Sequence, residues 1–135
     1  MSALIAFVVL VSQTPGAARP HRVVVEVNVP GTSAYGTVLG NVKNLQLAFA
    51  PEKVEVEVVC HGPGINMLFN DSKATRPRVL ALIHNGIHFA ACHNTMKTMK
   101  LSLKDLIPGV AVVPSGVAEV VRKQESGWSY LKGAY

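Results

Sequence analysis

The chain has 135 residues, of which 49% are hydrophobic and 16% are charged, a composition typical of one folded domain and not of a disordered protein. Its net charge is +5, but Lys and Arg are scattered and aromatic residues make up only 6%, which argues against a nucleic-acid-binding surface. Two cysteines are too few for a disulfide-rich scaffold.

The first 18 residues have the features of a secretory signal peptide. Residues 3–11 form an almost unbroken apolar run, and residues 12–18 contain the small residues typical of a cleavage site. The run is too short for a membrane-spanning helix, which needs about 20 apolar residues. We therefore expect a signal peptide over 1–18, a single domain over 19–135 and an exported, periplasmic protein. Because Met1–Ser2 carries no basic residue, the alternatives are a mis-assigned start or a first strand belonging to the fold, with a cytoplasmic location.

The first half of the predicted domain alternates between strand and helix patterns. Val23–Val29 places valines on one face of a strand, and Lys53–Cys60 does the same with two glutamates on its other face. Between them we expect a helix that is capped at Ser33 and stopped by Pro51. A Gly-Pro-Gly turn and a short apolar segment at 65–69 follow.

The second half continues the same alternation. A helix is expected to begin near Pro77 and to end at Asn85-Gly86, and a third strand covers Ile87–Ala91. The remaining elements are a helix capped by Asn94, a capping box at Ser102–Asp105, a strand at 110–113, a helix opened by Ser115 and ended at Gly127, and a short strand at 128–131. This order predicts a three-layer α/β/α sandwich with a mainly parallel sheet of four to five strands.

Cys92 is the residue that most clearly suggests chemistry. It follows the third strand directly before a predicted helix, and ligands bind beyond the carboxyl ends of parallel strands. The dipole and the unpaired N–H groups of a helix N-terminus favour a thiolate, the nucleophilic form. His93 is placed to lower the pKa of this thiol when protonated, or to donate a proton to a departing thiol. The alternatives are that Cys92 is a buried apolar residue and that His93 has no role.

Cys60 ends another strand, so a disulfide with Cys92 has to be considered. The glutamates of the second strand suggest a solvated edge, and the apolar first strand is expected to lie between the second and the third. The two cysteines would then be about 9.5 Å apart, beyond the about 7 Å that a disulfide allows. We expect Cys60 to be a core thiol at the floor of the pocket. A metal site is disfavoured because His84 and His88 flank a helix stop, so neither a metal nor another cofactor is expected.

Three motifs connect the chain with a known family. They are His61-Gly62-Pro63-Gly64-Ile65, Phe89-x-x-Cys92-x-Asn94-Thr95-Met96, and Pro108-Gly109 through Pro114-Ser115-Gly116-Val117 to Gly127-Trp128-x-Tyr130. In their order and spacing, the stretch Arg22–Tyr130 resembles the DsrE/DsrF-like family. The resemblance implies a small α/β sandwich that assembles as a homotrimer or homohexamer. It also implies sulfur chemistry, because the better-understood relatives pass sulfur between proteins as a cysteine persulfide.

These observations lead to two functional hypotheses. In the first, the protein carries sulfur as a persulfide on Cys92, assisted by His93, and exchanges it with donor and acceptor proteins. Turnover of a small substrate is not implied, so the protein would be sulfurtransferase-like at most. In the second, a non-catalytic oligomeric module holds a small anionic or nucleotide-like ligand in the same pocket. Both hypotheses use the same expected pocket-lining residues: His61, Gly62, Gly64, Asn94, Thr95, Ser115 and Gly116.

Overall fold

Five parallel strands form the sheet at the centre of the protein. The structure is a computed structural model that describes residues 19–134. The strands are β1 (His21–Val27), β2 (Val54–Cys60), β3 (His88–Cys92), β4 (Ala111–Val113) and β5 (Ser129–Lys132). Their order is β4-β3-β2-β1-β5, and every neighbouring pair is parallel. The predicted α/β fold with a parallel sheet is thus confirmed.

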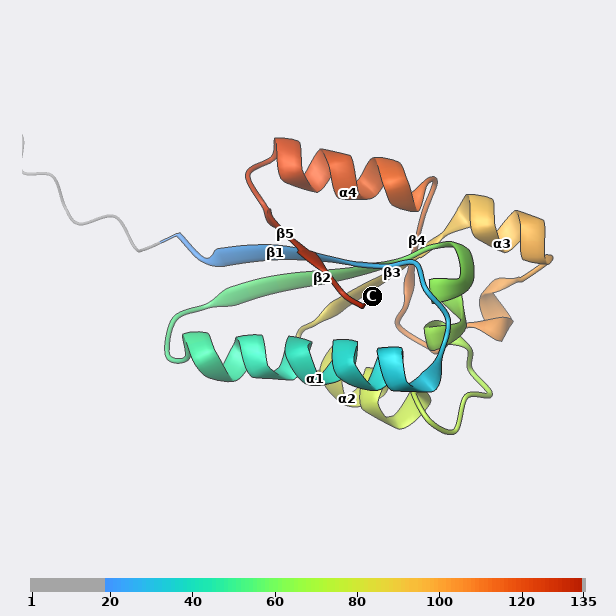
Figure 1. Ribbon diagram of the computed structural model, residues 1–135, viewed down its shortest axis with the longest axis horizontal. Helices are drawn as coiled ribbons and strands as arrows, with labels where there is room; N and C mark the ends of the chain where they lie inside the picture. Colours follow the sequence, from blue (N-terminus) through green and yellow to red (C-terminus); the bar gives the residue numbers. More distant parts are fainter. Residues whose placement is uncertain (1–18, 135) are drawn as a thin grey trace, which may run out of the picture.

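Helices cover both faces of this sheet (Figure 1). On one face lie α1 (Thr32–Phe49) and α2 (Arg76–His84), and on the other lies α4 (Gly116–Glu125). The shorter pieces are α3 (His93–Met99) and the 3-10 helices η1 (Gly62–Leu68) and η2 (Leu103–Asp105). Both α3 and η1 directly follow strands, so they stand at the carboxyl edge of the sheet.

The hydrophobic core is divided by the sheet into a large and a small part. The large part includes inward-facing valines of β1 and β2 with residues of α1 and α2. The small part consists of Val24, Val59, Ala90 and Val120. Val120 is the buried valine of α4, whereas Val117 and Val121 are 57% and 47% exposed. The α4 layer therefore leaves apolar side chains on the surface.

The expected position of the first strand in the sheet was wrong. β2 lies between β1 and β3, and β1 lies between β2 and β5. The glutamates of β2 suggested an open edge, but Glu57 faces the α4 layer, where Lys123 Nζ lies 2.6 Å from its Oε2. Because a helix residue supplies the opposite charge, a carboxylate is tolerated on a central strand.

Most predicted helix ends agree with the structure, and two predicted caps do not. Ser115 caps α4 by accepting a hydrogen bond from the Ala118 N–H, and Ser102–Asp105 forms the expected capping box. In contrast, α1 follows Gly31 and α3 follows Cys92, so Ser33 and Asn94 lie inside the first turns. The expected signal peptide lies outside the described residues. Within residues 19–134, none of the helices combines the length and apolar character that crossing a membrane requires.

Candidate functional site

Cys92 lies at the junction of β3 and α3. It is the last residue of the strand and occupies the N-cap position of the helix, with extended backbone angles. The strand runs through the protein interior, since Phe89, Ala90 and Ala91 are all buried. Cys92 itself is 5% exposed, so its thiol is almost entirely surrounded by protein at the carboxyl edge of the sheet.

Several hydrogen-bond donors converge on the Cys92 sulfur. They are the backbone N–H of Gly116, the hydroxyl of Thr95 and the backbone N–H groups of Thr95 and Asn94. Burial alone would raise the pKa of the thiol, but these donors outweigh it and hold the pKa below its ordinary value. Hydrogen bonds to the charged form favour that form. The surroundings therefore increase the fraction of nucleophilic thiolate.

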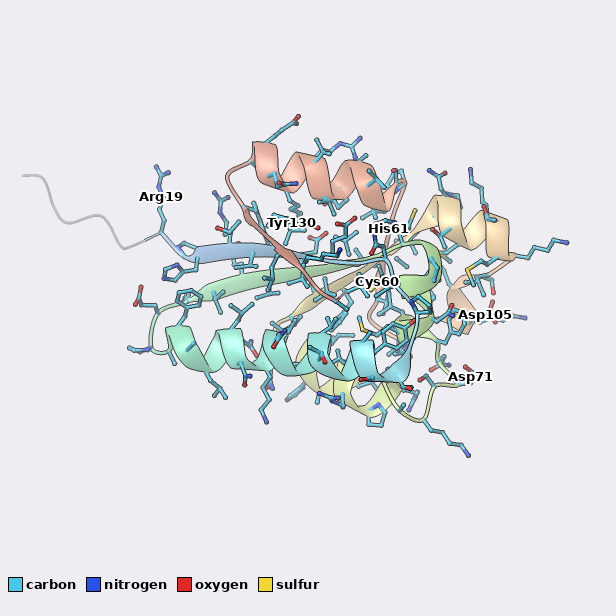
Figure 2. The ribbon with its side chains drawn as sticks, viewed as in Figure 1. Arg19, Cys60, His61, Asp71, Asp105 and Tyr130 are labelled. Carbon is cyan, nitrogen blue, oxygen red and sulfur yellow. The ribbon has the colours of Figure 1, made fainter. Side chains whose placement is uncertain are left out.

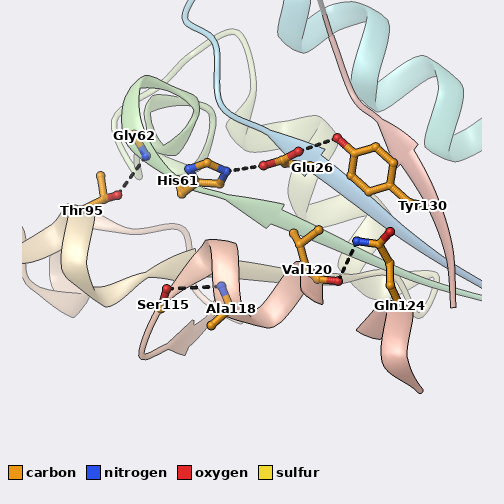
Figure 3. A network of polar contacts seen from close by, with 9 residues as sticks. All are labelled: Glu26, His61, Gly62, Thr95, Ser115, Ala118, Val120, Gln124 and Tyr130. Atoms are coloured by element: carbon orange, nitrogen blue, oxygen red, sulfur yellow. Dashed lines mark hydrogen bonds and ion pairs between the residues drawn. The ribbon is translucent and has the colours of Figure 1, made fainter. Parts of the chain in front are cut away.

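Thr95 connects the thiol to the turn that follows β2. Its Oγ1 accepts a hydrogen bond of 2.9 Å from the Gly62 backbone N–H (Figure 3), while its hydroxyl donates to the Cys92 sulfur. A hydroxyl that accepts one hydrogen bond becomes a better donor of another. The predicted residues Gly62 and Thr95 thus act on Cys92 as a pair.

Gly116 brings the N-terminus of α4 against the same sulfur. A Cβ at this position would lie 2.9 Å from His61 Cβ and 3.1 Å from Cys92 Cβ, too close for any side chain. Only glycine therefore allows α4 to begin here with its first N–H directed to the thiol. The same contact shows that His61 and Cys92 are neighbours. Ser115, as predicted, is a helix cap.

His61 belongs to a polar network that sequence reasoning did not find. Its Nε2 lies 2.6 Å from Glu26 Oε1, and the Tyr130 hydroxyl donates to Glu26 Oε2 (Figure 3). The side chains of His61 and Glu26 are only 16% and 18% exposed. Burial raises the pKa of Glu26, but hydrogen bonds from Tyr130 and His61, with the charges of His61 and Lys132, lower it overall. Glu26 is therefore ionised at neutral pH.

One sequence signal for this network existed. Glu26 is the only charged residue in the buried run Val23–Val27, and a carboxylate inside such a strand requires a partner. Tyr130 stood in the third motif, but no sequence pattern pointed to its partner Glu26, which lies 104 positions away in the chain.

The other predicted site residues lie in different surroundings. Gly62, Asn94 and Thr95 line a hollow of about 530 Å³, together with Pro63, Asn66, Thr98 and Met99. Gly64 does not line this hollow, because a Cβ there would lie 2.1 Å from the carbonyl oxygen of Val27. Gly64 is thus a close-packing position beneath β1. His93 begins α3 and is exposed.

Cys60 lies on the opposite face of the sheet from Cys92. It is fully buried in the large core and is the last residue of β2, directly before His61 (Figure 2). In register it pairs with Ala91, and successive side chains of a strand point to opposite faces. The absence of a disulfide is as expected, but the reason is this opposition and not a wide separation. Cys60 is not at the pocket floor, and burial raises the pKa of its thiol far above the ordinary value.

Metal-ligating side chains do not gather in the described part of the chain. Across residues 19–134, no three His, Cys, Asp or Glu side chains are grouped so that they could hold a metal ion.

The fold and this site together define a class: a small parallel α/β protein with a cysteine thiol at the carboxyl end of β3. The sequence profile of the DsrE/DsrF-like family matches residues 25–132, and the chain belongs to that family. Over most of the domain, the sequence resemblance and the fold thus lead to the same group of proteins.

Solved structures share this fold. The protein of unknown function MTH1491 from Methanobacterium thermoautotrophicum is 36% identical, with a TM-score of 0.79 over 83% of this chain and 98% of its own. The ychN protein from E. coli shares the fold at 12% identity, with a TM-score of 0.65 over 83% of this chain and 98% of its own. BT1422 from Bacteroides thetaiotaomicron is similar in fold at 12% identity and a TM-score of 0.65, over 82% and 93% of the two chains. No curated protein matches the chain.

Proposed function

We propose that this protein is a sulfur carrier that holds a sulfane sulfur as a persulfide on Cys92. The observation that supports the proposal most directly is the set of donors from Gly116, Thr95 and Asn94 around the Cys92 sulfur. A buried thiol with a purely structural role needs no such donors, as Cys60 illustrates. Donors that stabilise a thiolate also stabilise the anionic sulfur that leaves when the persulfide is passed on.

The loading step follows from the chemistry of a thiolate. The Cys92 thiolate attacks the outer sulfur of a donor persulfide, a new S–S bond forms, and the donor's own S–S bond breaks. The donor leaves as a thiolate, and the transferred sulfur keeps its oxidation state. No external oxidant or reductant is required. Delivery to an acceptor thiol is the same exchange in reverse, so the protein acts as a relay between two partners.

The assembly is the second part of the proposal. We propose a homotrimer or homohexamer, which is supported by exposed apolar side chains on α4 and on the two edge strands. They are Val112, Val117, Val121, Tyr130 and Leu131. Burying such residues between copies would remove apolar surface from water.

An exported location follows only from residues 1–18, and N-terminal sequencing of the protein from its own host tests it.

Intact mass after incubation with polysulfide tests the carrier function. The wild-type protein should gain the mass of one sulfur atom, and Cys92→Ser should gain none. Cys60→Ala is the matched control, since it removes the other thiol and should load normally. Loading that survives in Cys92→Ser contradicts the proposal. Tight binding of a small anion that tolerates Cys92→Ala, together with an unreactive thiol, would favour the binding module instead.

A further inference from the structure

We propose that His61, held by Glu26 and Tyr130, is the proton donor and acceptor for sulfur transfer at Cys92. This inference rests on the proposed carrier function and extends it, because a persulfide exchange moves a proton as well as a sulfur atom. It also assigns roles to Glu26, which lies on β1 outside every motif of the sequence, and to Tyr130 on β5.

The position of His61 is the first argument. His61 follows β2 and Cys92 ends β3, and these two strands are neighbours in the sheet. A Cβ added to Gly116 would lie 2.9 Å from the Cβ of His61 and 3.1 Å from the Cβ of Cys92. The side chains of His61 and Cys92 thus start from neighbouring points at the edge of the sheet where substrates of parallel α/β proteins bind.

The orientation of the imidazole is the second argument. Nε2 lies 2.6 Å from the Glu26 carboxylate. An ionised carboxylate accepts hydrogen bonds and cannot donate one. Nε2 therefore carries a proton in the neutral ring, and Nδ1 is the basic nitrogen that remains. A carboxylate that fixes one ring nitrogen sets the tautomer and leaves the other nitrogen for proton transfer.

Tyr130 supplies the third argument. Its hydroxyl donates to Glu26 Oε2 while His61 binds Oε1, so both carboxylate oxygens have partners from other elements. The carboxylate is consequently fixed between β5 and the turn after β2. Because Glu26 and Tyr130 act on the ring through these hydrogen bonds, we regard them as positioning residues.

The proton balance of the exchange gives His61 two tasks. When the Cys92 thiolate takes the outer sulfur of a donor persulfide, the donor departs as a thiolate, and protonated His61 transfers its proton to that sulfur. The new Cys92 persulfide carries the proton of the donor's outer sulfur, and neutral His61 then accepts it. Donor persulfide and Cys92 thiolate thus become donor thiol and anionic Cys92 persulfide, with the imidazole restored to its protonated form.

His93 is the competing histidine, since it directly follows Cys92 in sequence. It is exposed at the start of α3, and among residues 19–134 no carboxylate forms an ion pair with it as Glu26 does with His61. A solvated ring without such a partner is less well oriented for proton transfer. The structure therefore favours His61 over the histidine that the sequence suggested.

The experiment measures the rate of sulfur loading from glutathione persulfide as a function of pH, in the full-length wild-type protein and its variants. The wild-type profile should be bell-shaped, with a falling limb that depends on His61. His61→Gln should lose that limb and load about 10²-fold more slowly or worse. Glu26→Gln should alter the falling limb and slow loading, because the ring loses the carboxylate that orients it. Tyr130→Phe should have a smaller effect of the same kind, since it removes only one partner of that carboxylate.

Two controls separate a positioning role from a structural one. Glu57→Gln removes a carboxylate that is similarly buried and ion-paired on the same face, with Lys123, and should leave the pH profile unchanged. His88→Gln removes an exposed histidine at the other end of β3 and should also leave it unchanged. Far-UV circular dichroism and thermal melting establish that each variant is folded. If His61→Gln does not fold, the effect of Glu26→Gln and Tyr130→Phe on the falling limb of the pH profile still decides whether His61 takes part in proton transfer.

The outcomes distinguish the two proposals. If Cys92→Ser still accepts sulfur, the carrier function itself is wrong. If loading requires Cys92 but folded Glu26→Gln and His61→Gln keep the wild-type rate and profile, the carrier function stands and the role of His61 is overturned. The same holds if His93→Gln, and not His61→Gln, removes the falling limb.

Discussion

Gly116 donates its backbone N–H to the Cys92 sulfur from a position where a Cβ would lie only 3.1 Å from Cys92 Cβ. The first turn of α4 is therefore part of the thiol's surroundings, although it follows Cys92 by more than twenty positions in sequence. Its contribution is a backbone group, which depends on how closely two segments approach and not on side-chain chemistry. This relationship makes the properties of Cys92 sensitive to small changes in α4.

Gly116→Ala should disturb both stability and thiol chemistry. The added methyl would lie 2.9 Å from His61 Cβ, so α4 must shift, at a cost of about 1–3 kcal/mol. The shift lengthens the hydrogen bond to sulfur and raises the pKa of Cys92. Denaturant unfolding and the pH dependence of thiolate absorbance measure the two effects. Gly36→Ala in α1 is the control, because its Cβ would meet only Arg78 Nη1 at 3.6 Å and alanine favours helices.

Thr95→Val should raise the pKa of Cys92, because it removes the hydroxyl donor while keeping the shape of the side chain. It also leaves the Gly62 N–H without its acceptor, which costs about 1–3 kcal/mol if that group stays buried. Thr95→Ser keeps the hydroxyl and should behave nearly as wild type. Alkylation rates measured against pH test this prediction. Equal profiles for the valine and serine variants would show that the hydroxyl does not act on the thiol.

Glu26 should contribute stability that is lost in acid. The pKa of Glu26 is lower in the folded protein than its model value of 4.5, so the unfolded chain binds more protons around that pH. The contribution is therefore fully present above about pH 4.5 and disappears as the pH falls through the folded pKa. The difference in unfolding free energy between wild type and Glu26→Gln, measured from about pH 3 to 6, should increase with pH and then level off. A difference in unfolding free energy that is independent of pH would contradict a lowered pKa of Glu26 in the folded protein. The pKa of Asp105 is also lowered, but both proteins contain Asp105, so its contribution cancels in the difference.

The two cysteines should respond differently to the same substitution. Cys60→Ser buries a hydroxyl in an apolar core and should destabilise the protein by about 1–3 kcal/mol. Cys92→Ser should cost less, because the donors around the sulfur can bind a hydroxyl oxygen as well. Thermal melting compares the two variants. Mass spectrometry after alkylation should find only Cys92 modified in the native protein and both cysteines modified after denaturation.

Local patterns predicted much of this structure because they depend on neighbouring residues. Alternating valines marked β1 and β2, Asn85-Gly86 marked the end of α2, and Ser115 marked the start of α4. The position of Cys92 between a strand and a helix followed from the same patterns. Each of these features is governed by backbone preferences and hydrogen bonds within a few residues, so it can be predicted before the fold is known.

The tertiary structure alone decided which distant residues meet. The strand order placed β2 beside β3, and the alternation of side chains then put Cys60 and Cys92 on opposite faces. The contact of Glu26 with His61 and Tyr130 joins β1, the turn after β2 and β5. Strand order depends on how crossover helices pack the whole sheet, and that packing is a property of the complete chain. The sequence determined where the Cys92 thiol would stand, and the tertiary packing determined which groups surround it.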